Sequence, residues 1–517
     1  MLTRDSAIPK GLPKTTESLC PECLKIIRAT IRDENGKVVM EKSCPEHGHF
    51  KDVVWSDTGM YLRVEKWAKD GVGVENPAIA DAKVCPFDCG LCNLHLSHTG
   101  LANVDLTNRC NLRCPICFAN ANQAGYVFEP DYDTVVKMLK VLRDQKPVPT
   151  PAVQFSGGEP TIHPRFMDII KAAHDLGFAQ VQVATNGIEF AKSIEFCQKA
   201  SDAGLNTVYL QFDGLRPEIY VRARGKDLLG VKKKVIENFR KVERHSSIVF
   251  VPTIVKGVND DQVWPILRYA LENMDVVRGV NFQPVAFTGR ITNEELAKGR
   301  YTLPDLAKDM ESQSGGKIKM SDWYPVPAVA AISELWTALY GDPKITLTTH
   351  SHCGIATYMF VKDPEHIVPV TRFVQVEPLF EELYSLAKKA EGKRIKAFSK
   401  VKAFSLLKKY MIKDEVPEGL STTQFLKGLQ GVLSESTKTE LAKFSWQMMY
   451  VGAMHFMDSY NYDIERVKRC MIHYTTPDGK IIPFCAYNSG PVYRTEVEKK
   501  FSVPLAEWRK RHGDEYT

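Results

Sequence analysis

Three cysteines lie close together in the sequence Cys110-Asn-Leu-Arg-Cys114-Pro-Ile-Cys117, directly after the β-rich run 102–106. Three thiolates on one short loop can bind three irons of a four-iron cluster and leave the fourth iron without a protein ligand. Zinc is the alternative, but a tetrahedral zinc site needs a fourth ligand, and none follows in this loop. The loop therefore predicts an iron–sulfur cluster with one iron open to a small molecule.

The loop sits in a region that alternates short β-rich runs with longer helical patterns such as 131–142 and 164–176. This alternation is typical of repeated βαβ units around a parallel sheet. The predicted strands are Ala102–Leu106, Ala152–Phe155, Gln180–Ala184, Thr207–Gln211, Ile248–Ile254 and Gly279–Gln283. We expect an α/β fold with a partial barrel of six βα units, whose chemistry lies at the carboxyl ends of the strands.

Three regions are predicted along the chain. Residues 1–80 form an N-terminal metal-binding ribbon, with a β-hairpin over 30–41 that turns at Glu34-Asn-Gly. Residues 81–300 form the barrel with a cysteine-containing loop before it. Residues 301–517 form a mainly α-helical region that binds substrate and carries a further cysteine group.

The composition, 44% hydrophobic and 25% charged, is that of an ordinary soluble protein. No window approaches the roughly 20 apolar residues that span a bilayer, and the first residues lack an apolar run. We therefore expect a cytoplasmic protein without a transmembrane segment. The net charge of +6 is modest for 517 residues and does not indicate a nucleic-acid partner.

A second motif, Ser156-Gly157-Gly158-Glu159-Pro160, follows the next predicted strand. Two adjacent glycines let backbone approach a ligand closely, and Glu159 can accept a hydrogen bond from an amino group. Alone, this motif would usually be an ordinary turn. Its place one strand after a three-cysteine loop makes it much more specific.

These two motifs, in this order, resemble those of the radical S-adenosylmethionine (SAM) superfamily across about 103–289. The resemblance implies that SAM binds the open iron and contacts Phe118, Ser156, Gly157, Gly158 and Glu159. Cleavage of SAM then yields a 5′-deoxyadenosyl radical, which abstracts a hydrogen atom from substrate. Further SAM contacts are predicted at strand ends, where polar residues are also common as caps: Asn186, Gln211, Asp213 and Gln283.

Ten other cysteines remain of the thirteen. Cys197 lies in a helical pattern and is predicted to be a buried core residue. The other nine divide into three groups. The ribbon group comprises Cys20, Cys23, Cys44 and His47, and fits a single zinc or a rubredoxin-like iron.

The second cysteine group comprises Cys85, Cys89 and Cys92, with His95 as a possible fourth ligand of a cluster. A structural zinc is the alternative there. The third cysteine group comprises Cys353, Cys470 and Cys485, which only folding could gather. Three separated cysteines are more often unrelated, but the turn before Cys485 favours a site.

Two features of the C-terminal half concern a possible lipid. The segment 388–413 carries ten lysines and arginines beside one helical apolar face, which suits either a membrane surface or a solvated helix packed on the core. The segment 446–457 is rich in methionine and aromatic residues. It indicates either core packing or the wall of a hydrocarbon tunnel.

The whole ordered set of cysteine motifs resembles the archaeal tetraether lipid synthase family. This resemblance implies three four-iron clusters, two of them auxiliary, and one mononuclear iron or zinc. It also implies carbon–carbon coupling of phytanyl chains of diether lipids at the membrane surface, with a low-potential electron donor as partner. The alternative is a radical SAM methyltransferase of a hydroxymethylpterin. A non-catalytic electron-transfer scaffold is disfavoured, because it would not need the motif at 156–160.

Overall fold

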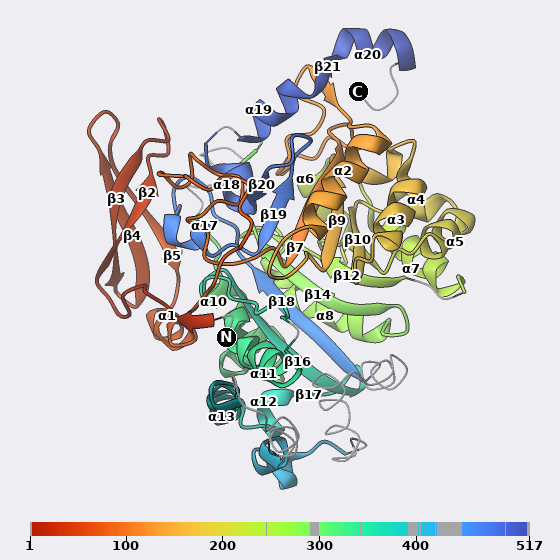
Figure 1. Cartoon of the computed structure of the whole chain (residues 1–517). Helices are drawn as coiled ribbons and strands as arrows, with labels where there is room; N and C mark the ends of the chain where they lie inside the picture. The colour runs from red at the N-terminus through yellow and green to blue at the C-terminus, as the bar shows by residue number, and fades with distance from the viewer. Residues whose placement is uncertain are drawn as a thin grey trace.

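Figure 1 shows the computed structural model of the chain, in which a small β-ribbon packs beside a larger α/β body. The structure describes residues 3–243, 246–289, 299–341, 343–390, 402, 405–418, 420, 447–491 and 493–513. The centre of the basic segment, 391–401, lies outside the described residues, and so do 403–404. The helix predicted there is therefore not described.

The ribbon is a four-stranded antiparallel sheet. Its strands, in both spatial and chain order, are β2 (Lys14–Leu19), β3 (Ile26–Glu34), β4 (Lys37–Cys44) and β5 (Gly48–Trp55). The predicted hairpin is confirmed, since Asn35 and Gly36 connect β3 and β4 with φ values of 54° and 78°. A two-residue hairpin turn needs such left-handed residues. The ribbon packs on the body through α1 (Thr58–Glu65) and the buried side chains of β3 and β4.

Six parallel strands form the partial barrel, and all six predicted strands are confirmed. They are β7 (Leu101–Thr107), β9 (Ala152–Gly157), β10 (Gln180–Thr185), β11 (Thr207–Gln211), β12 (Ser247–Val251) and β14 (Val277–Pro284). They are adjacent in chain order, and each neighbouring pair is parallel. The run predicted as 248–254 is divided between β12 and the short β13 (Thr253–Ile254).

Amphipathic helices connect these strands. They include α2 (Tyr132–Arg143), α3 (Phe166–Asp175), α5 (Ile194–Asp202), α7 (Leu229–Arg240) and α8 (Val263–Glu272). In α3, buried Phe166, Ile169, Ile170 and Ala173 recur at helical spacing on one face. Cys197 of α5 is fully buried, as predicted.

The C-terminal region extends the barrel sheet at both edges, which the sequence did not predict. At one edge β18 (Met448–Met454) runs parallel to β14, and β16 (Gly354–Asp363) continues the sheet antiparallel to β18. At the other edge β19 (Ile472–Thr475) runs parallel to β7 and pairs with β20 (Ile481–Pro483). These short runs lack the flanking helix patterns that mark βαβ units, so their role emerges only from long-range pairing.

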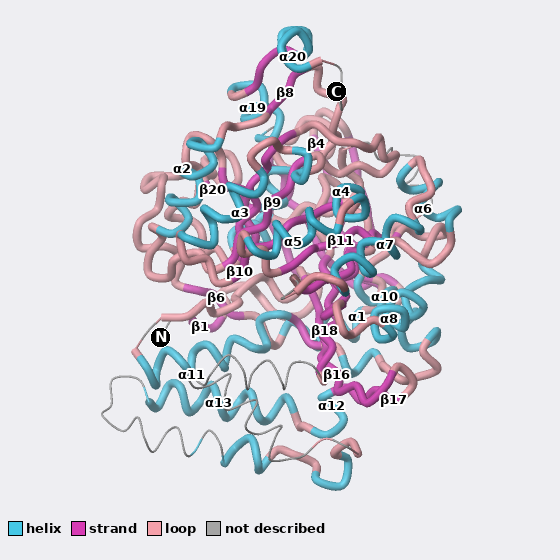
Figure 2. Tube along the Cα trace, turned by 90° about the vertical axis from the view of Figure 1, so that its right-hand side faces the viewer, coloured by secondary structure: helices cyan, strands magenta, loops and turns pink. Residues whose placement is uncertain are grey.

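The described part of the methionine-rich segment is mostly strand β18, and Met449, Val451 and Ala453 alternate into the main core. The predicted helices are present elsewhere in this region. Figure 2 shows α11 (Ala330–Tyr340) and α13 (Val376–Ala390) side by side below the barrel. They share a second, smaller core. No helix among the described residues combines the length and apolar character needed to cross a membrane.

Candidate active site

A cavity of about 400 Å³ lies at the carboxyl ends of the barrel strands, and Cys110, Cys114 and Cys117 line one wall of it. The side chain of Asn122 holds the cysteine loop. Its amide oxygen accepts from the Cys110 N–H at 3.0 Å, and its amide nitrogen donates to the carbonyl oxygens of Cys110 and Leu112 at 2.7 and 3.3 Å. The predicted three-thiol wall is therefore a fixed feature of the cavity.

The three thiols fit a cluster better than a single ion. Among the described residues, only the ribbon group brings three or more metal-binding side chains to within 4.8 Å of one another. Burial raises the pKa of Cys114, while the nearby guanidinium of Arg224 opposes that rise. A thiol in this setting needs the positive charge of bound metal to become a thiolate.

Gly157 and Gly158 bring the end of β9 against the start of the cysteine loop. The N–H of Gly158 donates to the carbonyl oxygen of Thr107 at 2.7 Å, and the N–H of Glu159 donates to that of Arg109 at 2.9 Å. A Cβ at Gly158 would lie 2.1 Å from the Arg109 oxygen. The close approach of these glycines to the backbone of Thr107 and Arg109 therefore positions the cysteine loop. The sequence had suggested instead a close approach of the backbone to a ligand. Both glycines also line the cavity.

Glu159 is buried and connects the end of β9 with the end of β10 through hydrogen bonds. Its carboxylate accepts from the hydroxyls of Thr161 and Thr185 at 2.5 and 2.7 Å, and from the N–H of Asn186 at 2.8 Å. Burial raises its pKa, and these donors oppose the rise. Glu159 also lines the cavity, as Ser156 does. That it holds an amino group remains a prediction.

The other predicted contacts separate into two kinds. Asn186, Gln211 and Gln283 line the cavity. Asp213 is fully buried behind the wall, where its carboxylate forms a bidentate ion pair with Arg224 at 2.8 Å for both contacts. Arg224 itself lines the cavity. Asp213 itself does not line the cavity, so its predicted contact with SAM remains a prediction.

Two buried cations near the cysteine loop were missed from the sequence, namely Arg224 and Lys232. Lys232 is fully buried, and its amine donates to the Asn186 carbonyl oxygen and to Gln211 Oε1, the latter at 3.2 Å. Burial lowers its pKa to about 7. Both residues lie on helices without any motif, so no sequence signal distinguished them from exposed basic residues.

The floor of the cavity is polar. Gln154 donates to Asn103 Oδ1 at 2.7 Å, and Gln182 donates to Gln154 Oε1 at 2.8 Å. On the other side Asn281 donates to the hydroxyl of Tyr209. Asn103, Gln154, Tyr209 and Asn281 all line the cavity. Because their side chains point inward from parallel strands, the sheet aligns them without a contiguous sequence motif.

Aromatic side chains from the C-terminal region form the opposite wall. Phe456 and Phe484 stack with ring centroids 3.8 Å apart, and Phe118 of the cysteine loop lies 5.4 Å from Phe484. Arg494 lines the cavity beside them and bonds Asp105 at 2.8 Å. Phe118 therefore contacts this aromatic wall, and its contact with SAM remains a prediction.

The third cysteine group is brought together by folding. Cys353, Cys470 and Cys485 line one small cavity with Arg466, whose Nε donates to the sulfur of Cys353 at 3.3 Å. Burial raises the pKa of Cys485 to about 12, and Arg466 opposes this rise. Met454, Phe456 and Ile472 line both this cavity and the larger one. The group thus shares a wall with the active cavity.

The second cysteine group lies on the loop 85–92, where Cys89 and Cys92 are buried. His95 is buried as well, and its Nε2 lies 2.8 Å from the Cys470 carbonyl oxygen and 3.2 Å from His473 Nε2. Burial lowers the pKa of His95 to about 4, so that the ring is neutral. With Nε2 engaged, only Nδ1 could serve as the predicted fourth ligand.

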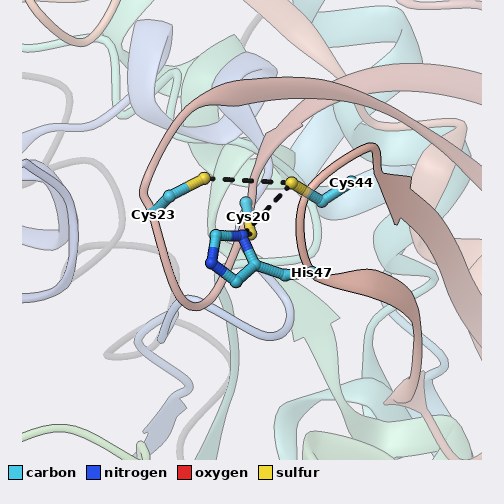
Figure 3. A group of neighbouring side chains, drawn as sticks. All are labelled: Cys20, Cys23, Cys44 and His47. Carbon is cyan, nitrogen blue, oxygen red and sulfur yellow. Dashed lines mark hydrogen bonds between the residues drawn. The ribbon is translucent and has the colours of Figure 1, made fainter.

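The ribbon group is compact. In Figure 3, Cys20, Cys23, Cys44 and His47 converge from two facing turns. His47 Nδ1 lies 3.5 Å from the Cys44 sulfur and 3.7 Å from the Cys20 sulfur. A hydrogen bond from His47 lowers the pKa of Cys44 to about 6. Three thiols and one imidazole at this spacing fit a single tetrahedral ion.

Comparisons with known proteins agree with both metal-binding regions. The Radical SAM superfamily matches residues 104–270, and the family described as the HMPTM N-terminal zinc ribbon domain matches residues 12–56. The crystal structure of SuiB from Streptococcus suis bound to its precursor peptide SuiA aligns with 42% of this chain and 46% of its own. It does so at 18% identity and a TM-score of 0.35.

Two curated relatives cover different shares of the chain. A 7,8-dihydro-6-hydroxymethylpterin dimethyltransferase of Methanocaldococcus jannaschii is 48% identical over 503 residues, which are 97% of this chain and 98% of that protein. A tungsten-containing aldehyde ferredoxin oxidoreductase cofactor-modifying protein of Pyrococcus furiosus is 31% identical over 216 residues. That match covers 40% of this chain and 58% of the relative.

The predicted tetraether lipid synthase activity is wrong, because the relative that matches nearly the whole chain is a pterin methyltransferase. The cysteine motifs determine how the radical is generated, and both activities share that step. The substrate depends on the residues that line the cavity. The prediction of a radical SAM enzyme is confirmed. The chain belongs to the radical SAM family that includes the 7,8-dihydro-6-hydroxymethylpterin dimethyltransferase of Methanocaldococcus jannaschii.

Proposed function

We propose that this protein is a radical SAM methyltransferase that acts on 7,8-dihydro-6-hydroxymethylpterin. The full-length relationship to an enzyme of that name supports the substrate. The match to the radical SAM superfamily supports the radical chemistry. The cavity at the carboxyl ends of the barrel strands supports the combination of the two.

The observation that carries the proposal is that primary amides line the same cavity as the three thiols. A pterin presents N–H donors together with carbonyl and ring-nitrogen acceptors along one edge. Each amide offers both a donor and an acceptor, and can therefore match such an edge. Asn103, Gln154, Asn281 and Gln283 supply four amides at the floor of the cavity. The Gln182–Gln154–Asn103 chain fixes the orientation of two of them.

The aromatic wall complements the flat face of the same ring. Phe456 and Phe484 form a stacked pair, and Tyr474 lies 5.4 Å from Phe484. Offset stacking against such rings favours a planar heterocycle. An apolar chain could form no hydrogen bond with these amides, whereas the edge of a pterin can both donate to them and accept from them.

The thiol wall then sets the geometry of the reaction. When bound, a four-iron cluster and SAM supply the 5′-deoxyadenosyl radical that removes a hydrogen atom from a substrate carbon. The side chains of this protein hold the pterin against that wall, and the buried ends of β9 and β10 keep the wall in place. We also propose that a low-potential one-electron donor is the protein's redox partner.

The proposal is tested by anaerobic incubation of the reconstituted protein with reductant, 7,8-dihydro-6-hydroxymethylpterin and SAM labelled in its methyl group. Mass spectrometry should find 5′-deoxyadenosine and a pterin that carries one or two added methyl groups. The label shows whether the methyl carbon comes from SAM. Absence of methylated pterin, while SAM is cleaved, would contradict the proposal.

Substrate recognition is tested by Gln154→Leu, with Gln198→Leu at a partly exposed position on α5 as the matched control. Removal of the Gln154 amide should raise KM for the pterin by about tenfold, since one lost hydrogen bond in a buried site is worth about 1.4 kcal/mol. KM for SAM should change much less. An equal rise in both KM values would place Gln154 in a general structural role.

A further inference from the structure

His455 carries an unpaired ring nitrogen beside the third cysteine group. The side chain is 2% exposed, and its Nε2 atom has no hydrogen-bond partner within the described residues. His455 lines the same small cavity as the three cysteines of that group, and no other histidine among the described residues lines it. A buried ring nitrogen without a partner costs about 1–3 kcal/mol, so it points to a ligand that the polypeptide itself does not provide.

Strand pairing places His455 opposite Cys353. Gly354, the first residue of β16, pairs with Met454, the last residue of β18, in antiparallel register. One step further along, the N–H of His455 donates to the Cys353 carbonyl oxygen at 3.0 Å. Directly opposed residues of an antiparallel pair have their side chains on the same face of the sheet. The backbone therefore brings the thiol and the imidazole to one side, where both line the cavity.

Two further contacts hold the backbone around His455 in place. Arg466 of α17 (Ile464–Lys468) donates to the His455 carbonyl oxygen at 2.6 Å and to the Cys353 sulfur at 3.3 Å. The N–H of Met457, two residues after His455, lies 3.3 Å from the Cys485 sulfur. The segment 455–457 is therefore bonded to two of the three cysteines.

The donor set in this cavity is three thiols and one imidazole. An imidazole binds metal in its neutral form, through a ring nitrogen that carries no proton. Within the part of the chain that the structure describes, the ligand atoms come within 4.8 Å of one another only in the ribbon group. The four side chains of this cavity are thus spaced more widely than a single ion requires, and they fit a cluster of several irons.

We propose that Nε2 of His455 is the fourth protein ligand of a four-iron cluster held by Cys353, Cys470 and Cys485. Each iron of this cluster then has a ligand from the chain, whereas the cluster of the loop 110–117 keeps one iron open. A cluster without an open iron binds neither SAM nor substrate, and is suited to electron transfer. The inference goes beyond the proposed function, because it concerns a metal site and needs no pterin.

The test uses the reconstituted full-length protein without SAM or pterin, produced with histidine labelled with ¹⁵N in its ring. Iron and sulfide content are measured first, followed by pulsed electron paramagnetic resonance of the reduced protein. The wild type should show a hyperfine coupling to a histidine nitrogen that is lost in His455→Cys. The coupling should persist in the control His98→Ala, because His98 is also fully buried with an unpaired Nδ1 but does not line the cavity.

The reduction potential gives a second readout. Replacement of a thiolate by an imidazole raises the potential of an iron–sulfur cluster. His455→Cys should therefore lower the midpoint potential of one cluster and keep the wild-type iron content. His455→Ala offers no ligand and should lose iron that His455→Cys retains, which a residue with only a packing role would not show.

A wild-type protein without any histidine coupling would overturn the inference, and this result needs no variant to fold. So would a His455→Cys protein with wild-type coupling and potentials. Neither result depends on methylation of the pterin, so failure here is distinguishable from failure of the proposed function.

Discussion

At the scale of single residues, two polar side chains that resemble ligand contacts in sequence bond other groups of the protein itself. Glu159 accepts from the hydroxyls of Thr161 and Thr185, and Asp213 is paired with Arg224. Such groups gather where parallel strands end, because unpaired donors there require acceptors. A polar residue at a strand end can therefore be essential to an active site without touching the ligand.

Asn122 offers a direct test of this supporting role. Asn122→Ala removes three hydrogen bonds to the cysteine loop and should lower the unfolding free energy by about 1–3 kcal/mol. Iron content after reconstitution should fall as well. Asn273→Ala, which removes one bond to the Tyr269 carbonyl oxygen of α8 and one from Arg240, is the control and should retain full iron. Equal iron content in both variants would contradict the role of Asn122.

Lys232 should give the protein a pH-dependent stability. Its folded-state pKa of about 7 lies below the ordinary value of 10.5, because burial disfavours the charged amine. Between those pH values the unfolded chain binds more protons, so this residue makes the unfolding free energy rise with pH. Chemical denaturation from pH 7 to pH 9.5 should show wild type gaining stability relative to Lys232→Met. A constant or falling difference would contradict this assignment.

At the scale of secondary-structure elements, the end of β9 determines where the cysteine loop lies. Gly157 has a φ of 122° and its Cβ position would lie 2.2 Å from the Thr107 oxygen. Only glycine tolerates both the conformation and the approach. The motif thus joins two strand ends, and its sequence reflects packing as much as binding.

Gly158→Ala tests that junction. The added methyl group would meet the Arg109 carbonyl oxygen at 2.1 Å and should push the loop away from β9. We expect a loss of about 1–3 kcal/mol in unfolding free energy, which is typical of overpacking, together with weaker SAM binding. Gly230→Ala, where nothing lies within 4 Å, is the control. Wild-type SAM affinity in Gly158→Ala would contradict the proposed junction.

At the scale of the whole molecule, the N-terminal ribbon, the barrel and the C-terminal region are held by shared contacts. Arg300 is buried between Asp52 of the ribbon and Asp458 of the C-terminal region, with Nε 2.8 Å from Asp52 and Nη1 2.7 Å from Asp458. Lys42 of the ribbon donates to the Ser459 carbonyl oxygen at 2.7 Å. These contacts connect the ribbon to the segment 458–463, which precedes Cys470 in the chain.

Arg300→Met should show this coupling. It leaves the fully buried carboxylate of Asp458 and the partly buried carboxylate of Asp52 without their partner, and should cost about 3–5 kcal/mol of unfolding free energy. Hydrogen exchange should increase in the ribbon and in 458–463 together. Arg32→Met, which breaks the partly exposed ion pairs of Arg32 with Glu34 and Glu41 within the ribbon, is the control and should cost much less. Increased exchange confined to the barrel would contradict the coupling.

The sequence by itself determined the features that depend on local spacing. The strands of the barrel, the hairpin at Asn35-Gly36, the ribbon group and the loop from Cys110 to Cys117 were all predictable, because each is encoded within a few dozen residues. The radical chemistry followed from the same motifs. The substrate did not, since motifs for making a radical are common to enzymes that act on different molecules.

Tertiary structure alone decided how distant segments meet. Three features depend on long-range packing. They are the pairing of β18 and β19 with the barrel edges, the convergence of Cys353, Cys470 and Cys485, and the placement of Arg224 and Lys232 near the Cys114 thiol. Such contacts leave no periodic trace, because each partner is a single residue in an otherwise ordinary strand or helix. The cavity's amides and aromatic rings are determined in the same way.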